Sequence, residues 1–347
     1  MTSILGLDIG GAHLKAAAFQ EGRLMETRQI ACPLWQGEDK LDTALAAISD
    51  LKTDGAPIAV TMTAELSDLF DTRQEGVRWI IARLDREFPA QTLHIWTSNG
   101  IFVSPHEARD VPDTIASMNY LATAHFAAHH VPDGIMIDMG TTTTDLIPLI
   151  DSRPVLSGTS DAQRLANSEL VYTGLTRTAV MAVADQVPFK GLMVPLCREY
   201  FATMADVQRI LGTLAEGIDV QATADGRGQS VEESIARLAR MLGCDADDAT
   251  NSEWTLVARH VARAQLSPVA EALGVLLSRT PALADKPIIT TGCAHTQLNE
   301  FALREGFEPR PFHTLFRDTI PNATDINTCA TAASVAALLA THLKSGV

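Results

Sequence analysis

An Asp-x-Gly step occurs twice in this chain, each time directly after an apolar run. Asp8 and Gly10 follow Ile4-Leu5-Gly6-Leu7, and Asp138 and Gly140 follow Ile135-Met136-Ile137. A single copy is typical of an ordinary β-turn, because Asp and Gly both favour turns. Two matched copies with a strand-like run on each side instead predict two lobes that face each other across a phosphate-binding cleft.

Small residues follow both aspartates. A glycine has no Cβ, so a turn can approach a phosphate closely and direct its N–H groups at it. Threonine hydroxyls can bond phosphate oxygens without adding charge. The expected phosphate-binding residues are Gly10, Gly11, Gly140, Thr141, Thr142 and Thr143.

The charged residues of the two copies predict a metal-assisted site. Two carboxylates facing one cleft, Asp8 and Asp138, can hold a hydrated Mg²⁺ that neutralises a di- or triphosphate. Lys15 follows the first turn and could add a cation, whereas Asp145 stands at the matching position of the second copy. We therefore expect Asp8, Lys15 and Asp138 to be catalytic, with Mg²⁺ as the cofactor.

Composition limits the classes of function. The chain has 347 residues, a formal net charge of −15 and 46% hydrophobic residues, which is typical of a globular protein with a sizeable core. No Lys/Arg-rich run supplies the basic footprint that nucleic-acid binding needs. We find neither an apolar run of about 18 residues nor a signal peptide. We expect a cytoplasmic protein with no membrane or nucleic-acid partner.

The elements that position these residues follow an α/β pattern. Strands are expected over 3–8, 12–20, 23–32, 57–63 and 92–97, and helices over 40–52, 72–88 and 114–130. Residues 160–271 look mostly helical, with one long helix over 254–279, and 330–342 looks like a terminal helix. This organisation predicts a first lobe of residues 1–132 and 325–347, and a second lobe of 133–324 with a helical insertion at about 160–270.

Three further segments could line the cleft. Residues 288–294 form a strand that runs into a glycine turn at Gly292, where a nucleotide or another bulky group could lie against the backbone. Two polar segments, 172–178 and 223–228, interrupt the helical region. They are either plain loops or ligand-facing loops, in which case Arg177, Asp225 and Arg227 are the expected substrate contacts.

Together these motifs resemble the actin-like ATPase superfamily, which includes sugar kinases, Hsp70 and actin. The resemblance implies an α/β fold of two lobes of the ribonuclease H-like type. In that fold 8–15 and 138–145 are the phosphate loops, 288–294 is the adenosine-type loop and 330–339 is the connecting helix. The last of these loops reads Thr-Thr-Gly-Cys-Ala rather than Gly-Gly-Gly or Gly-Gly-Ala, which disfavours adenine.

Residues 7–17, 169–178 and 223–228 resemble a narrower group, the hydantoinase/oxoprolinase-like family. Its archaeal members are linked to one-carbon transfer on tetrahydromethanopterin and include a synthase of methanofuran biosynthesis. The resemblance implies Mg²⁺-dependent transfer of an (aminomethyl)furan-methyl group from its diphosphate to the phenol oxygen of a tyramine or tyrosine derivative, such as γ-glutamyltyramine. Diphosphate is released, and the enzyme is a transferase of alkyl groups.

The expected partners are therefore a small furan diphosphate and a phenolic acceptor. The sequence leaves open whether the protein forms a homodimer. The phenol proton needs a carboxylate acceptor, for which Asp138, Asp145 and Asp225 are candidates. Two alternatives remain. One is an ATP-dependent small-molecule kinase or a hydantoinase/oxoprolinase-type hydrolase, and the other is a nucleotide-regulated assembly protein of the actin type.

Overall fold

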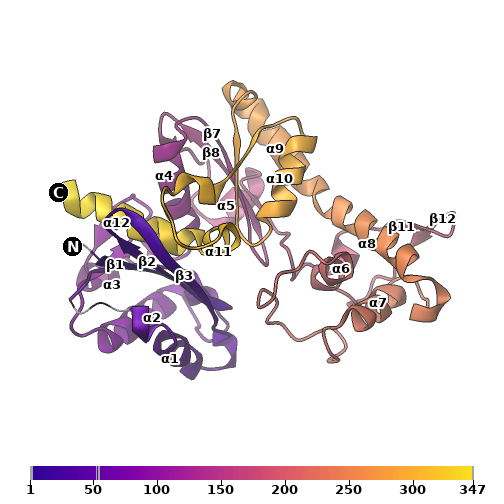
Figure 1. Ribbon diagram of the computed structural model, residues 1–347, viewed down its shortest axis with the longest axis horizontal. Helices are drawn as coiled ribbons and strands as arrows, with labels where there is room; N and C mark the ends of the chain where they lie inside the picture. The colour runs from indigo at the N-terminus through magenta and orange to yellow at the C-terminus, as the bar shows by residue number, and fades with distance from the viewer. Residues whose placement is uncertain (1–2, 52, 54, 346–347) are drawn as a thin grey trace.

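The computed structural model describes residues 3–51, 53 and 55–345, and its longer strands form two sheets. The first sheet has the order β3-β2-β1-β4-β5-β6 (Figure 1). Its strands are β1 (Ser3–Ile9), β2 (His13–Gln20), β3 (Arg23–Ala31), β4 (Ile58–Met62), β5 (Leu93–Trp96) and β6 (Phe102–Val103). The first three form an antiparallel meander, whereas β4 and β5 run parallel to β1.

The second sheet repeats the motif of paired strands joined by a tight turn. Its order is β10-β8-β7-β13-β14, with β9 paired to β8. Its strands are β7 (Gly134–Met139), β8 (Thr144–Ile150), β9 (Arg153–Pro154), β10 (Leu170–Val171), β13 (Ile288–Thr291) and β14 (Pro309–Pro311). As in the first sheet, the antiparallel pair β7–β8 is extended by a parallel neighbour, here β13.

Each sheet has a helical layer on its outer face, and two helices lie between the sheets. The outer helices are α1 (Asp39–Ala46), α2 (Arg73–Glu87) and α3 (Pro105–Asp110) on the first sheet, and α9 (Ser267–Arg279) and α10 (His295–Arg304) on the second. The helices α4 (Asn119–His130) and α12 (Ala330–Ser345) share one core with residues of both sheets. This layer joins the lobes and leaves the turns after β1 and β7 facing one space.

A close approach of α12 to β1 depends on a glycine. A Cβ built on Gly6 would lie 2.0 Å from the carbonyl oxygen of Ala332 and 2.9 Å from the Cβ of Ala336. Small residues on both elements therefore allow the helix to lie directly on the strand that ends in Asp8.

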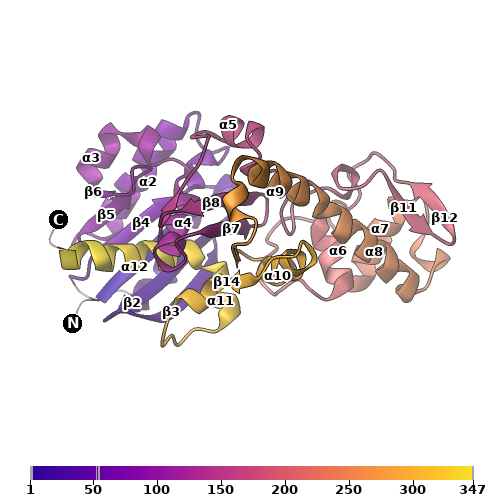
Figure 2. The ribbon, with the colours of Figure 1, turned by 90° about the horizontal axis from the view of Figure 1, so that it is seen from above.

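The chain between β10 and α9 forms a separate helical unit, which lies to one side of the two sheets (Figures 1 and 2). It contains β11 (Gln186–Phe189), β12 (Leu192–Pro195), α6 (Met204–Leu211), α7 (Val231–Arg240) and α8 (Asn251–Gln265). Trp254 is fully buried and stacks on Phe189, with ring centroids 5.1 Å apart. This insertion therefore has its own apolar core.

Several expected elements need correction. The region 160–271 is not only helical, because it contains β10 and the hairpin β11–β12. The long helix expected over 254–279 is two helices that break at Leu266, since Pro268 cannot donate a backbone hydrogen bond and clashes with the preceding turn. The helix expected from 114 begins only at Asn119. Residues 1–2, 52, 54 and 346–347 of the expected first lobe lie outside the described residues.

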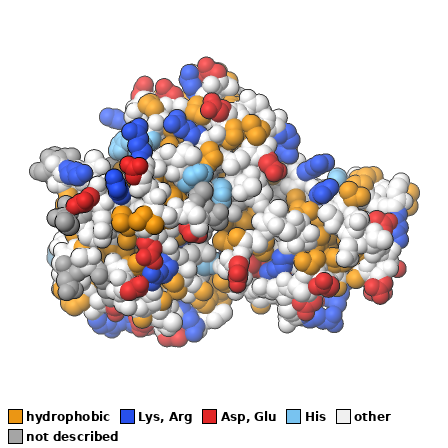
Figure 3. Space-filling model, viewed as in Figure 1, with side chains coloured by type: hydrophobic (Ala, Val, Ile, Leu, Met, Phe, Trp, Pro, Cys, Tyr) orange, Lys and Arg blue, Asp and Glu red, His pale blue; other side chains and the backbone are white. Residues whose placement is uncertain are grey.

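On the face drawn in Figure 3, the described residues form no basic patch. On that face, Lys and Arg side chains of the described residues are interspersed with Asp and Glu, and the body and the insertion are separated by an indentation. Within the described part of the chain, no helix has the length and apolar character to span a membrane.

Candidate functional site

The two Asp-x-Gly turns have the same strand register. Asp8 on β1 lies opposite Lys15 on β2, and Asp138 on β7 lies opposite Asp145 on β8. The repeat seen in the sequence is therefore a repeat in structure. The residue opposite the aspartate is a cation in the first turn and an anion in the second.

The hydrogen bonds that close the turns also match. The Gly10 N–H donates to the carbonyl of His13 at 3.0 Å, and the Gly140 N–H donates to the carbonyl of Thr143 at 3.0 Å. The first turn thus places three small residues between its strands and the second places four small or polar residues, as a phosphate-binding turn requires.

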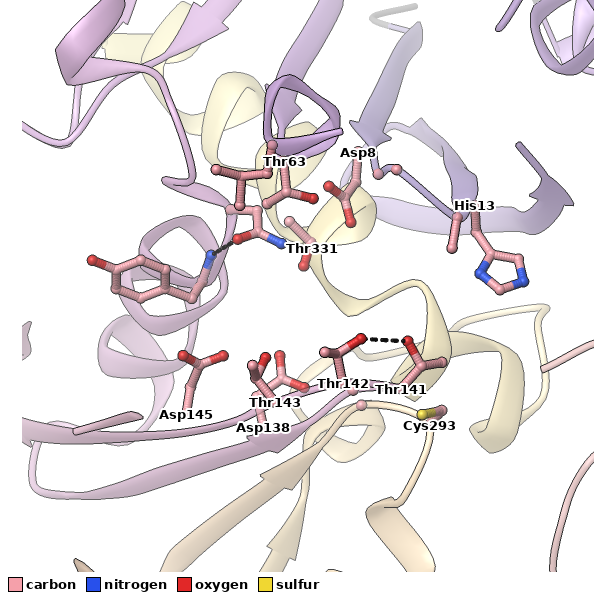
Figure 4. Close-up of a pocket in the computed structure, with 18 of the residues that line it drawn as sticks. Asp8, His13, Thr63, Asp138, Thr141, Thr142, Thr143, Asp145, Cys293 and Thr331 are labelled. Atoms are coloured by element: carbon pink, nitrogen blue, oxygen red, sulfur yellow. Dashed lines mark hydrogen bonds between the residues drawn. The ribbon is translucent and has the colours of Figure 1, made fainter. Parts of the chain in front are cut away.

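A cleft of about 650 Å³ lies between the two turns. This volume is in the range of small-molecule sites. Figure 4 shows Asp8 and Thr63 on one side and Asp138, Thr141, Thr142, Thr143 and Asp145 on the other. The sequence-predicted residues that line it are Asp8, Gly10, Gly11, Lys15, Asp138, Gly140, Thr141, Thr142, Thr143, Arg177 and Gly292.

The first turn carries an ion pair. Lys15 Nζ lies 3.5 Å from Asp8 Oδ2, and the Asp8 side chain is 2% exposed. Burial acts to lower the pKa of Lys15, but Asp8 together with Asp138 and two nearby cysteines outweighs it, so that pKa lies above its usual value. Asp8 Oδ1 is buried and has no hydrogen-bond partner among the described residues. Lys15 therefore stays a cation, and one oxygen of Asp8 is left for a ligand.

In the second turn the residue opposite the aspartate is an anion, Asp145, instead of a cation. Burial raises the pKa of Asp138 to about 7, and the nearby Asp145 carboxylate raises it further while Lys15 opposes the shift. Asp145 itself accepts a hydrogen bond from Arg164 at 2.6 Å. The guanidinium of Arg164 in turn lies 3.8 Å from the centroid of the Tyr120 ring. Asp145 is thus held in an ion pair, whereas Asp138 can exchange a proton near neutral pH.

The polar segment 172–178 packs against the second turn and forms hydrogen bonds with it. The N–H groups of Thr176 and Arg177 donate to the carbonyl of Thr141 at 3.2 and 2.9 Å. A Cβ on Gly174 would lie 2.4 Å from the backbone nitrogen of Thr142, so only glycine fits there. Arg177 Nη1 is 3.5 Å from the Thr142 hydroxyl. This segment therefore lies against the second phosphate turn, and its Arg177 lines the cleft.

Gly292 lies in the cleft wall against Asp138. Its φ is +86°, and a Cβ at this position would lie 2.3 Å from the carbonyl oxygen of Met139 and 2.4 Å from Asp138 Oδ1. The glycine is required for this close approach, and it limits where the Asp138 carboxylate can lie.

The structure does not bring Asp225 and Arg227 to the cleft. Asp225 accepts a hydrogen bond from Arg237 at 3.1 Å and lies 3.5 Å from Arg240, inside the insertion. Arg227 is largely exposed and pairs weakly with Asp225 at 3.9 Å. Neither residue is among those that line the cleft. Of the three carboxylates considered as proton acceptor, Asp138 and Asp145 line the cleft and Asp225 does not.

Several lining residues were not among the expected site residues. Tyr120 on α4 and Arg164 on α5 (Asp161–Ala166) line the cleft but belong to no motif. His13 lies in the first turn, and its Nε2 is 3.2 Å from the carbonyl of Gly217 in the insertion. Burial lowers the pKa of His13 to about 4, so the ring is neutral and Nε2–H donates to that carbonyl. The first turn is thereby linked to the insertion.

The donors available for a metal are few. Within the described residues no group of three or more His, Cys, Asp or Glu side chains could hold a metal ion. Mg²⁺ commonly binds through one or two carboxylates together with substrate phosphates and water. The free Oδ1 of Asp8 and the carboxylate of Asp138 fit that second kind of site, in which the phosphate completes the coordination.

Comparisons with known proteins relate this chain to a family and to named relatives. A family model described as Hydantoinase/oxoprolinase matches residues 57–300. The (4-{4-[2-(gamma-L-glutamylamino)ethyl]phenoxymethyl}furan-2-yl)methanamine synthase of Methanocaldococcus jannaschii is 37% identical over 251 residues, 72% of this chain and 74% of that protein. A protein of the same name from Methanococcus vannielii is 31% identical over 131 residues, 38% of this chain and 59% of that protein.

Among solved structures, a nucleotide-free acetone carboxylase superposes with a TM-score of 0.58 at 10% identity, covering 96% of this chain and 70% of that one. Similarity at this level concerns the fold alone. The expected α/β fold of two actin-like lobes is confirmed.

Proposed function

This chain belongs to the hydantoinase/oxoprolinase family, and on that premise we propose that it is a transferase of methanofuran biosynthesis. In this proposal it transfers an (aminomethyl)furan-methyl group from its diphosphate to the phenol oxygen of a tyramine derivative such as γ-glutamyltyramine. The name of the two archaeal relatives describes such a product, because it contains a phenoxymethyl bridge between a benzene ring and a furan.

The reaction exchanges one C–O bond for another. The bond between the furan-bound CH₂ carbon and the diphosphate oxygen breaks, and its electron pair leaves with diphosphate. The phenol oxygen forms the new bond to the same carbon and loses its proton to a base. A furan ring can stabilise positive charge on the CH₂ carbon, so the leaving group can depart early and catalysis depends on stabilising its charge.

The first turn and the hydroxyls of the second are suited to hold the diphosphate. Lys15 is a half-buried cation that lines the cleft, and its charge would act on the leaving group with less screening than at the open surface. The N–H groups of Gly10 and Gly11 and the hydroxyls of Thr141 and Thr142 would orient its oxygens. Mg²⁺ held by Asp8, with Asp138 reached only through water, would supply further charge neutralisation when bound and leave the Asp138 carboxylate available as a base.

Asp138 is the best-placed proton acceptor. Asp145 is held in an ion pair with Arg164, and Asp225 lies outside the cleft. A carboxylate with a pKa of about 7 is a stronger base than an ordinary aspartate and is still ionised in part at neutral pH. The observation that carries the proposal is this carboxylate between two opposed phosphate-binding turns in a chain 37% identical to a named synthase.

A product assay tests the proposal. The protein would be incubated with (aminomethyl)furan-methyl diphosphate, Mg²⁺ and either tyramine, γ-glutamyltyramine or tyrosine, and ether product and diphosphate would be measured together. We expect stoichiometric formation of both. ATP turnover with none of these acceptors yielding an ether would instead favour the kinase or hydrolase alternative.

A further inference from the structure

A smaller side pocket of about 120 Å³ lies beside the cleft, in the insertion. Two residues, Arg177 and Gln221, line both the cleft and this pocket. At about 30 Å³ for each water, the pocket has room for about four waters. It is therefore too small for a whole substrate but large enough for a polar head group of a substrate whose other end lies in the cleft.

Fixed charges of both signs line the side pocket. Asp206, which is 1% exposed, accepts hydrogen bonds from Arg237 at 2.7 and 2.9 Å. Asp219 accepts one from Arg209 and one from the backbone N–H of Gln221 at 3.1 Å. These carboxylates are thus held rigidly by neighbours in the insertion, and their positions do not depend on a ligand.

Two hydrogen-bond donors at the junction of the pockets lack strong partners. Among the described residues the side chain of Arg177 has one hydrogen bond, at 3.5 Å to the hydroxyl of Thr142, and no ion pair with a carboxylate. The Nε2 of Gln221 is buried and has no hydrogen-bond partner among the described residues. A buried amide without a partner is costly, so this donor indicates an acceptor supplied by a ligand.

We propose that the side pocket binds the amino-acid head of the acceptor's γ-glutamyl group, with its α-carboxylate at Arg177 and Gln221 and its α-ammonium at Asp219. The inference rests on the proposed function for the identity of the acceptor. The phenol at the other end of the same molecule then extends into the cleft toward Asp138.

The charges of the pocket favour this head group over diphosphate. A zwitterion presents one charge of each sign, which matches a lining that contains both arginines and carboxylates. A diphosphate carries several negative charges and no cation, so it could not pair with the carboxylate of Asp219 as the ammonium of a zwitterion can. The aminomethyl group of the furan donor has no carboxylate, so it leaves Arg177 and Gln221 without an acceptor.

Direct binding separates this inference from the proposed function. Calorimetry would compare γ-glutamyltyramine with tyramine, which has the phenol but not the amino-acid head. A charge-assisted hydrogen bond corresponds to roughly 10- to 100-fold in affinity. We expect the wild-type protein to prefer γ-glutamyltyramine by about that factor, and Arg177→Gln to lose most of the preference.

Two further variants complete the design. Gln221→Glu places a negative charge beside the α-carboxylate and should also abolish the preference. Arg198→Gln, in which an 86% exposed arginine of the same insertion is changed, should keep it. In turnover assays the ratio of kcat/KM for the two acceptors should fall with Arg177→Gln, while the KM of the furan diphosphate stays the same.

The inference is overturned if Arg177→Gln leaves the preference for γ-glutamyltyramine intact, or if the loss appears in the KM of the furan diphosphate. If the preference depends on Arg177 but no acceptor yields an ether product, the side pocket stands and the proposed transfer reaction does not.

Discussion

The turns after β1 and β7 share a backbone and differ in electrostatics. In both, an aspartate at a strand end lies opposite a charged residue on the next strand, and a glycine N–H closes the turn at 3.0 Å. Opposite Asp8 this residue is Lys15, which forms an ion pair with it. Opposite Asp138 it is Asp145, which raises the pKa of Asp138 beyond the effect of burial. The shared register fixes where the carboxylates lie, and the cross-strand neighbour determines what each can do.

The largest effect is expected from removing the proton acceptor of the second turn. Asp138→Asn should lower kcat by about 10³-fold, within the range typical of general-base catalysis. The matched control is Asp185→Asn, at a carboxylate that is 87% exposed in the insertion. Steady-state kinetics of ether formation measures both. Equal rates for Asp138→Asn and the control would remove Asp138 from the mechanism.

Removing the cation of the first turn should have the next largest effect. Lys15→Gln takes a half-buried positive charge from the diphosphate side of the cleft and should lower kcat/KM for the furan diphosphate by about 10²-fold. Lys15→Arg keeps the charge and should retain more activity than Lys15→Gln. If both substitutions behaved alike, position and not charge would be what matters at this residue.

The glycines at the two turns should differ in their contribution to stability. A Cβ at Gly10 would lie 2.7 Å from the carbonyl oxygen of His13, whereas one at Gly140 would lie 3.8 Å from that of Thr143. Gly10→Ala should therefore destabilise the fold by about 2 kcal/mol and Gly140→Ala by under about 0.5 kcal/mol. Urea unfolding of both variants measures this difference, and equal losses would mean that the first turn relaxes freely.

The smallest effect concerns stability against pH. The pKa of Asp138 is about 7 in the folded protein and near 3.8 when unfolded, so the folded state holds its proton more tightly. The stabilising contribution of the protonated carboxyl is complete below pH 3.8 and is lost as the pH rises through 7. Asp138→Asn lacks this loss. The full shift corresponds to about 4 kcal/mol, but the Asp138 side chain is only partly buried, so we expect the variant to be more stable than the wild type by about 1–2 kcal/mol at pH 8.

Urea unfolding of both proteins without ligand, at pH 5 and pH 8, measures this effect. The advantage of Asp138→Asn should be larger at pH 8 than at pH 5. If the variant and the wild type differed in free energy of unfolding by the same amount at both pH values, Asp138 would have an ordinary pKa. The two turns would then differ in their steric fit but not in the pKa of their aspartates.

Local patterns predicted much of the fold and part of the site. The meander, the repeated turns and most strands follow from apolar runs with glycine turns, which depend on neighbours in sequence. The hairpin β11–β12 lies in a region that looked helical, and one expected helix is broken at Leu266. Both differences arise because packing in the insertion and one proline override average helical spacing.

The site residues likewise fall into those that a local motif predicts and those that only the fold brings together. Asp8, Lys15 and Asp138 were recognised because each belongs to a repeated motif. No sequence motif pointed to Tyr120 or Arg164, because they belong to two different helices and come together only at the cleft. Asp225 and Arg227 had a promising local sequence, but the fold pairs Asp225 with arginines of the insertion instead.

The sequence by itself determined that two aspartate–glycine turns exist and that small residues surround them, because a turn is set by the residues within it. Only the tertiary structure decided that the turns share one cleft and that Asp138 has a pKa of about 7. It also placed Arg177 and Gln221 between the cleft and a side pocket. Burial and electrostatic contact depend on distances between residues far apart in the chain, and those distances exist only once the lobes and the insertion have packed.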